Sequence, residues 1–201
     1  VSVLGCSKVE VSSEGAAATT EIVGLIVSSS APAATTEPTT TTVPIATTET
    51  EESVQDTSEL FSDRDLEQSA DVATATQMNL ESNQDVTLNK EGVYVLSGEV
   101  ENVTVMVDAA EDAKVQIVLD GVSITNENSP AIYVKAADKV FVTTTDGKNH
   151  MEVSGSYVAD GDTNLDAVIF SKADMTLNGT GILEIISSEG NGISSKDDLK
   201  I

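Results

Sequence analysis

The sequence predicts an all-β fold, a parallel β-helix that follows an N-terminal segment without regular structure. Three observations lead to this prediction. From Gln84 onward, short runs of β-branched residues alternate with turns rich in Gly, Asn, Asp and Ser. A nine-residue string that begins at Ile169 recurs, in similar form, at Ile193, an offset of 24 residues. The region from Ala16 to about Gln55 is rich in Thr and Pro and has too few apolar residues to bury a core.

Residues 1–15 contain the only cysteine of the 201-residue chain, Cys6. Small and apolar residues that precede a lone cysteine are typical of the end of a bacterial lipoprotein signal. On this interpretation Cys6 carries the lipid, and the protein is extracellular and bound to the membrane only through that lipid. The alternative is an incidental free thiol in an unfolded start.

Residues 16–55 are predicted to form a disordered stalk rich in Thr, Pro and Glu. This stretch holds three of the four prolines and no Lys or Arg. Residues 56–83 are predicted to be an N-terminal cap, because a stack of strands must cover its first exposed rung. Within this cap Ser62 is expected to begin a helical turn, with Asp65 three positions later as the second member of a capping box.

Residues 84–201 are predicted to form the stacked strands and to end inside a strand, which leaves the β-helix incomplete. An earlier copy of the string begins at Ile132, 37 residues before Ile169, and an acidic insertion accounts for the greater distance. A period in the low twenties is typical of a parallel β-helix, in which like residues of successive turns lie side by side. By strand alternation, Ile132, Ile169 and Ile193 are predicted to point inward.

Each of the three isoleucines is followed three positions later by a lysine, and these are Lys135, Lys172 and Lys196. They are predicted to point outward in a row, about 4.8 Å apart, which is the distance between neighbouring strands. The simpler interpretation is a surface ladder of ion pairs with the acids that follow each lysine. The functional interpretation is a row of cations that binds the carboxylates of an acidic polysaccharide.

The insertion contains acidic and amide side chains at alternate positions: Asp160, Asp162, Asn164 and Asp166. Ca²⁺ takes six to eight hard oxygen ligands, and a loop with a glycine can wrap around it. The pattern differs from an EF-hand, because Ser171 stands where a bidentate Glu is required. We therefore predict a calcium site here, with a solvated acidic turn as the alternative. Second-rank ligand candidates are Glu189, Asn191, Asp197 and Asp198.

The charge balance excludes some partners. The chain has 34 acidic and ten basic residues and a formal net charge of −24, so it lacks the basic patch that nucleic acids require.

No catalytic set is predicted. His150 is the only histidine, and the nucleophile-elbow and phosphate-loop motifs are absent. A lyase mechanism would need a base such as Lys172 or Lys196 beside a calcium-bound uronate.

Several strings of the sequence resemble, in the same order, a family of clostridial surface proteins known as carbohydrate-binding domain-containing proteins. They are Phe61–Leu66, Ala113–Val122, Ile132–Val142, Ile169–Lys172 and Ser195–Ile201. The resemblance implies a right-handed parallel β-helix similar to that of pectate lyases. It also implies binding of calcium and of polygalacturonate or cellulosic material, without an established enzyme activity. Members of the family are commonly lipoproteins.

Taken together, these features predict a non-catalytic, monomeric cell-surface protein that binds acidic plant cell-wall polysaccharide with the help of Ca²⁺. The first alternative is a calcium-dependent pectate lyase. The second is a structural adhesin or stalk protein.

Overall fold

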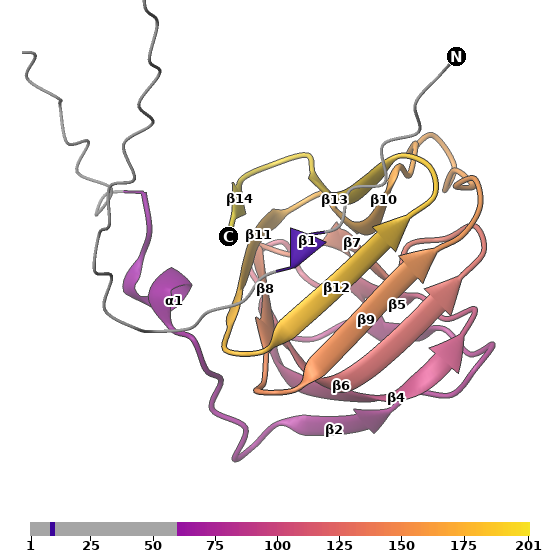
Figure 1. Cartoon of the computed structure of the whole chain (residues 1–201). Helices are drawn as coiled ribbons and strands as arrows, with labels where there is room; N and C mark the ends of the chain where they lie inside the picture. The colour runs from indigo at the N-terminus through magenta and orange to yellow at the C-terminus, as the bar shows by residue number, and fades with distance from the viewer. Residues whose placement is uncertain (1–8, 11–59) are drawn as a thin grey trace, which may run out of the picture. The chain divides into compact units, whose positions relative to one another are not determined.

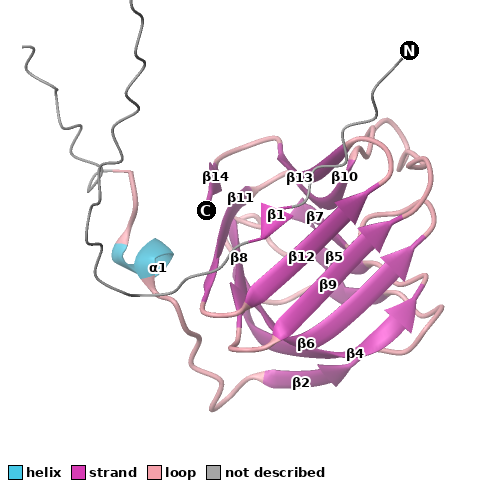
Figure 2. Cartoon of the chain, in the orientation of Figure 1, coloured by secondary structure: helices cyan, strands magenta, loops and turns pink. Residues whose placement is uncertain are grey.

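The computed structural model describes residues 9–10 and 60–201, and these residues are almost entirely β-strand (Figures 1 and 2). The single helix in this part of the chain is the short α1 (Asp63–Leu66). Cys6 and the predicted stalk at 16–55 lie outside the described residues. Among those described, no helix is both long and apolar enough to cross a membrane.

The strands belong to two sheets. The larger sheet holds β1 (Val9–Glu10), β2 (Thr76–Asn79), β4 (Gly92–Glu101), β6 (Lys114–Asn126), β8 (Lys139–Thr144), β9 (Lys148–Val153), β11 (Asp174–Gly179), β12 (Ile182–Ser187) and β14 (Leu199–Lys200). The smaller sheet holds β3 (Val86–Leu88), β5 (Val105–Asp108), β7 (Ile132–Ala136), β10 (Ala167–Ser171) and β13 (Asn191–Ser195). Every pairing is parallel except that of β1 with β12.

The chain runs in repeated circuits through the two sheets. Each circuit passes once through the smaller sheet, then along two arms of the larger sheet, and returns one strand further on. In the early circuits a single bent strand such as β6 forms both arms, pairing first with β8 and then with β9. In the later circuits the arms are separate strands, such as β11 and β12. Figure 1 shows successive circuits stacked from β2 toward β12.

The bend between the two arms depends on glycine. Gly179 has φ +117°, and a Cβ at this position would lie 2.3 Å from the carbonyl oxygen of Thr144 in the neighbouring circuit. At Gly181 the corresponding distance, to Thr145 O, would be 1.6 Å. Only glycine lets the two backbones approach this closely. The circuits can therefore stack at the corner as tightly as they do along the strands.

The repeat seen in the sequence corresponds to a row of paired residues. Ile132 pairs with Ile169, and Ile169 pairs with Ile193, on adjacent parallel strands of the smaller sheet. Val105 extends the row on the other side of Ile132. Val105, Ile132 and Ile169 are completely buried in the core between the sheets, and Ile193, in the outermost strand, is partly buried. The predicted lateral pairing and inward direction are confirmed.

The first part of the predicted cap forms α1, and its last part is already strand. Ser62 and Asp65 form the expected capping box, with each side chain bound to the backbone of the other. The helical turn packs against β11 rather than across the end of the stack. Strand β2 is the first rung of the larger sheet and pairs with β4.

Candidate functional site

Lys135, Lys172 and Lys196 lie on three successive rungs at one corner of the stack, and we call them the lysine row. The backbone N–H of Lys172 donates to Val134 O at 3.0 Å. In the same way, Lys196 N donates to Ser171 O at 2.9 Å. These bonds continue the ladder of β7, β10 and β13, so the three lysines follow one another at the spacing of the strands. The row was thus predictable from the repeat.

The three side chains differ in what they contact. Lys135 Nζ forms an ion pair with Asp160 Oδ2 at 2.9 Å, and it lies 5.8 Å from the centre of the Tyr133 ring. Lys196 Nζ lies 5.2 Å from the centre of the Phe170 ring. Both distances suit a cation–π contact, which holds an ammonium group over an aromatic face. The two rings meet edge to face, with their centres 5.8 Å apart.

Lys172, in the middle of the row, is exposed. Within the described part of the chain, no carboxylate oxygen lies within 4.0 Å of its Nζ. Its charge still acts on Asp160, where it is one of the smaller causes that lower the carboxyl pKa. Lys172 and Lys196, for which no ion pair is found among the described residues, can therefore bind an external anion without losing one, whereas Lys135 would first have to release Asp160.

A shallow hollow of about 420 Å³ adjoins the lysine row and is lined by both signs of charge. Lys135 and Lys172 contribute the cations. The acids that line it are Glu111, Asp138, Asp174 and Asp197. Asp138 is occupied in part, because it pairs with Lys114 at 3.0 Å. An anionic ligand here would meet the lysines directly and the carboxylates only through a bridging cation.

The predicted calcium loop places its four candidate ligands in different surroundings. Asp160 is bound to Lys135 and also accepts a hydrogen bond from Tyr133 Oη at 3.2 Å. Asp162 and Asn164 are exposed to solvent. Asp166 lies beside Asn191, whose backbone N–H donates to Asp166 O at 2.7 Å. The four residues thus have different contacts, and one of them, Asp160, is already bound to a lysine.

Asp166 is the member of this set whose surroundings suit a cation. Its Oδ1 is buried and has no hydrogen-bond partner among the described residues, and its other carboxylate oxygen is 3.5 Å from Asn191 Nδ2. A buried carboxylate oxygen without a partner is costly, and a hard cation would satisfy it. The described residues contain no group of three or more His, Cys, Asp or Glu side chains arranged to hold a metal ion. Calcium binding by this loop stays a prediction.

A second carboxylate–lysine site, which the sequence did not reveal, lies beneath α1. The Asp65 side chain is fully buried and accepts hydrogen bonds from Lys139 Nζ, Lys200 Nζ and Thr176 Oγ1. Burial by itself would raise the pKa of Asp65. The bonds from Lys139, Thr176 and Ser62 outweigh it and hold the pKa far below its usual range. This carboxylate is consequently an anion at neutral pH.

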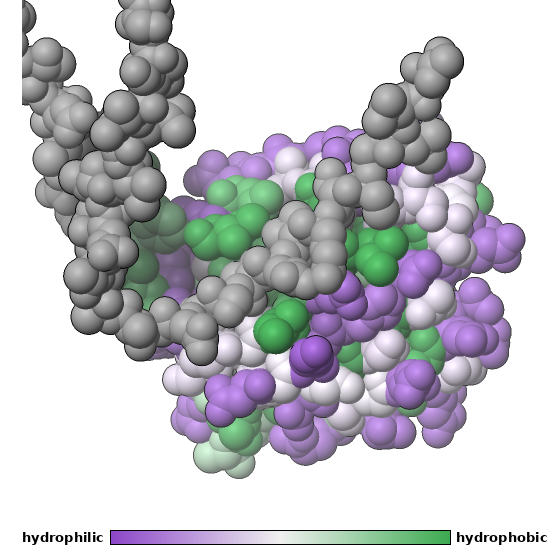
Figure 3. Space-filling view, in the orientation of Figure 1, coloured by the Kyte–Doolittle hydropathy of each residue, from purple (hydrophilic) through white to green (hydrophobic). Residues whose placement is uncertain are grey.

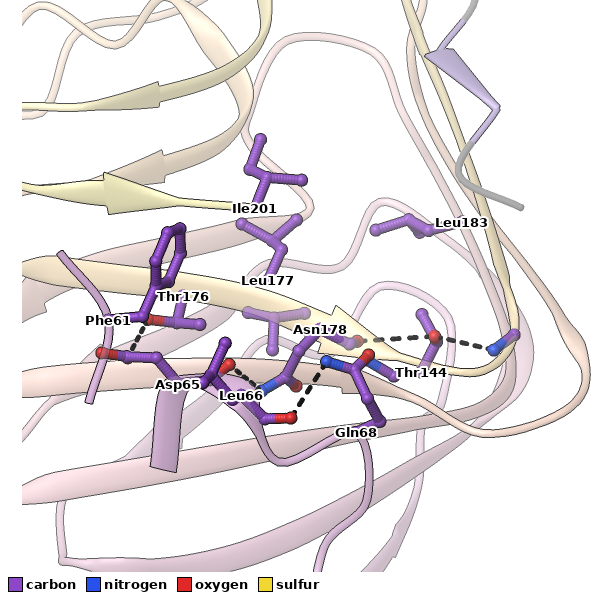
Figure 4. A pocket seen from close by; sticks show the side chains of 13 residues that line it. Phe61, Asp65, Leu66, Gln68, Thr144, Thr176, Leu177, Asn178, Leu183 and Ile201 are labelled. Atoms are coloured by element: carbon purple, nitrogen blue, oxygen red, sulfur yellow. Dashed lines mark hydrogen bonds between the residues drawn. The ribbon is translucent and has the colours of Figure 1, made fainter. Parts of the chain in front are cut away.

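Beside Asp65 lies a pocket of about 240 Å³ between α1 and the sheet (Figure 4). Its lining is mostly apolar, from Phe61, Leu66, Val142, Leu177, Leu183 and Ile201. The carboxylate at its wall is already bound to Thr176, as the dashed line in Figure 4 shows. Sugars need polar groups that are available to orient their hydroxyls. We therefore consider the lysine row, and not this pocket, the better candidate for a sugar ligand.

His150 lies on the outer face of the larger sheet, away from the lysine row. Its ring nitrogens are 3.3 Å from carboxylate oxygens of Glu184 and Glu152. The face of the molecule in Figure 3 is mainly hydrophilic, with apolar residues scattered over it. A histidine that contacts two carboxylates on such a face is accounted for as a surface hydrogen-bonding group.

The repeated circuits of strands and the exposed lysines define a class of protein, a repetitive β scaffold with a charged surface along one corner. Comparison with known sequences identifies its family. The chain belongs to the carbohydrate-binding domain-containing protein family, whose model matches residues 82–201.

A carbohydrate-binding domain-containing protein of Acetivibrio thermocellus is 35% identical to this chain over 123 residues. The matched part makes up 60% of this chain and 43% of the relative, so the chain spans less than half of the relative's length. No solved structure matches the chain.

Proposed function

We propose that the protein is a non-catalytic module that binds acidic polysaccharide, of the polygalacturonate type, at the lysine row. The observation that carries this proposal is the arrangement of Lys135, Lys172 and Lys196 on successive rungs, with Lys172 exposed and without an ion pair in the described part of the chain. A polymer with one carboxylate per sugar can place several anions along such a row. Membership of a carbohydrate-binding family supports a sugar polymer as the partner.

The described aromatic residues favour this ligand over crystalline cellulose. The chain has no Trp, and Tyr133 and Phe170, which flank the lysines, are buried. They are consequently not available as the flat, exposed platforms on which neutral sugar rings stack. Charge and hydrogen bonding are left as the main sources of affinity, and they select for carboxylated sugars.

Calcium is a further part of the proposal. The acids around the hollow would repel a polyanion, and a Ca²⁺ ion shared between them and the ligand would remove that repulsion. Asp166 and Asn191 are where we place a second, structural ion. If the loop holds such an ion, chelation lowers the melting temperature.

We also propose that the circuits wind as a right-handed parallel β-helix, because crossover connections between parallel strands are almost always right-handed.

We further propose that the protein is a monomer and that a lipid on Cys6 attaches it to the outside of a bacterial cell. Mass spectrometry of the protein purified from its natural membrane tests the lipid directly.

The test of function is a pull-down of the full chain with insoluble pectin, with Ca²⁺ and with chelator. We expect the wild type to bind and Lys172→Gln to bind several-fold more weakly. Lys148→Gln, which removes an exposed lysine at the start of β9 in the larger sheet, is the matched control and keeps wild-type binding. Equal binding by both variants contradicts a role for the row.

The same samples separate the alternatives. A pectate lyase releases unsaturated uronides, which absorb in the ultraviolet, when it is incubated with polygalacturonate and Ca²⁺. A structural adhesin or stalk protein retains no polysaccharide in either buffer. Release of unsaturated uronides by the wild type would replace the binding module with the enzyme.

A further inference from the structure

We propose that Asp160 is a built-in anion that occupies the Lys135 position of the lysine row, and that a carboxylate of the bound polysaccharide displaces it. The inference rests on the proposed function and adds a residue that sets affinity and specificity at the same site. It also gives Asp160 a role different from that of a calcium ligand.

The contacts of Asp160 are those that a uronate carboxylate would make. A single oxygen, Oδ2, lies 2.9 Å from Lys135 Nζ and 3.2 Å from Tyr133 Oη. An ammonium and a phenol are thus aimed at one anionic oxygen. Burial, as the largest cause, raises the pKa of Tyr133, so the phenol keeps its proton and stays a donor.

The exposure of this ion pair makes exchange feasible. The side chains of Lys135 and Asp160 are 33% and 45% exposed. Ion pairs between partly exposed side chains are weak, because water solvates both partners well when they separate. The contact of Asp65 with Lys139 differs in this respect, since the Asp65 side chain is 0% exposed. Asp65 is a permanent part of the fold, whereas Asp160 can leave.

In the loop between β9 and β10, the tip, residues 160–163, can move while the base at Leu165 stays fixed. Asp160 and Thr163 bond to each other's backbone in both directions, at 3.0 and 2.9 Å, and Gly161, between them, has φ +57°. The tip is therefore a self-contained tight turn. The base is fixed separately by Leu165, which is buried in a cluster with Tyr133 and Phe170. Displacement of Asp160 leaves that cluster intact.

The charges ensure that the exchange is a competition between anions. The hydrogen bond from Lys135, and after it that from Tyr133, lowers the pKa of the Asp160 carboxyl. Asp160 is therefore charged at neutral pH, as a uronate is, so the exchange is between two anions. Lys172, next along the row, offers the first contact to an incoming chain, and Lys135 becomes available when Asp160 gives way.

The test is the Kd for polygalacturonate, measured by isothermal titration calorimetry on the full chain, once in the presence of chelator and once in the presence of Ca²⁺. Asp160→Asn removes the competing charge and keeps the shape of the side chain. We expect its Kd to fall by about two- to fivefold, in line with the small strength of an exposed ion pair. Asp63→Asn, which makes the same change of charge at an exposed position of α1, is the control and leaves Kd unchanged within error.

Two further measurements sharpen the result. Lys135→Gln is expected to weaken binding more in the Asp160→Asn background than in the wild type, because only there is Lys135 fully available to the ligand. Fully methyl-esterified pectin, which lacks the carboxylates, is expected to gain nothing from Asp160→Asn.

The outcomes are distinct. If wild type and Asp160→Asn bind with the same Kd, the displacement is refuted and the binding function stands. If Asp160→Asn binds more weakly, and only when Ca²⁺ is present, Asp160 is a calcium ligand and the displacement is likewise refuted. If neither protein binds polygalacturonate in any buffer, the proposed function fails together with the inference.

Discussion

One carboxylate, that of Asp65, joins α1 to strands that are distant in the sequence. It binds Lys139, Thr176 and Lys200, which lie 74, 111 and 135 residues further along the chain. Arg64 adds a cation–π contact, with its guanidinium 4.7 Å from the centre of the Phe141 ring. These contacts link three circuits of the stack through one short segment, so α1 acts as a clamp on the outer face of the larger sheet.

Replacement of Asp65 is expected to destabilise the protein. Asp65→Asn leaves two lysine ammonium groups next to each other without their anion, which costs about 3 kcal/mol, at the lower end for broken buried pairs because the lysines keep some solvent contact. Urea unfolding followed by circular dichroism measures the loss. Asp63→Asn, in the same helical turn but exposed, is the control and changes stability by less than about 0.5 kcal/mol.

The same residue predicts how stability responds to acid. The pKa of Asp65 is lower in the folded than in the unfolded protein, so its contribution is complete above the unfolded value of about 4. The contribution decreases as the pH falls below that value toward the folded pKa. The stability difference between wild type and Asp65→Asn is therefore expected to be constant from pH 5 to 7 and to narrow toward pH 3, in urea melts at each pH. A gap that widens in acid would contradict this assignment.

At the scale of elements, the row of inward-pointing residues Val105, Ile132, Ile169 and Ile193 stabilises the stack of strands. Ile169 has paired neighbours on both sides, and Ile193 has one on its inner side in the described part of the chain. Ile169→Ala is expected to cost about 3–4 kcal/mol, because it removes a buried side chain and leaves a cavity between two rungs. Ile193→Ala, at a partly exposed position, is expected to cost roughly 1 kcal/mol. Similar losses in denaturant melts would indicate that the row is not layered in this way.

The repeat made these rows predictable, because similar strings that recur along the chain can bury like residues together only when they lie side by side. Lys172 and Lys196 occupy the same position in two copies of this string, so their placement on neighbouring strands was predictable as well. The capping box of Ser62 and Asp65 was predictable for a different reason, since both residues belong to one local motif.

Contacts between unlike segments could not be predicted in this way. No local pattern relates Asp65 to Lys200 or to Thr176, and the docking of α1 against β11 depends on the long-range hydrogen bond from Thr176 to Asp65. The same holds for Asp160, which lies in a segment without a counterpart in the other repeats. The sequence showed its oxygen ligands but not the lysine, in another repeat, that one of them binds.

For the whole molecule, the net charge of −24 sets the approach of a charged ligand. A polyanion is repelled at a distance, and in the proposed function the lysine row attracts it only at contact. Screening shortens the reach of this repulsion, from about 30 Å at 0.01 M salt to about 8 Å at 0.15 M. The association rate with polygalacturonate, measured by surface plasmon resonance, is therefore expected to rise over this range. A rate that falls would show that the local lysines outweigh the total charge.

The insertion between Val153 and Ala167 leaves the ladder on either side of it unchanged: Ile169 still pairs with Ile132, as it does with Ile193 after a shorter path. Because the closure entropy of a loop grows only slowly with its length, such a corner tolerates exchange of its loop at little cost. The residues that stabilise the fold are thus separate from the loop that carries Asp160. Replacement of this loop in a relative would change the side chains beside the lysine row and leave the buried rows of the sheets unchanged.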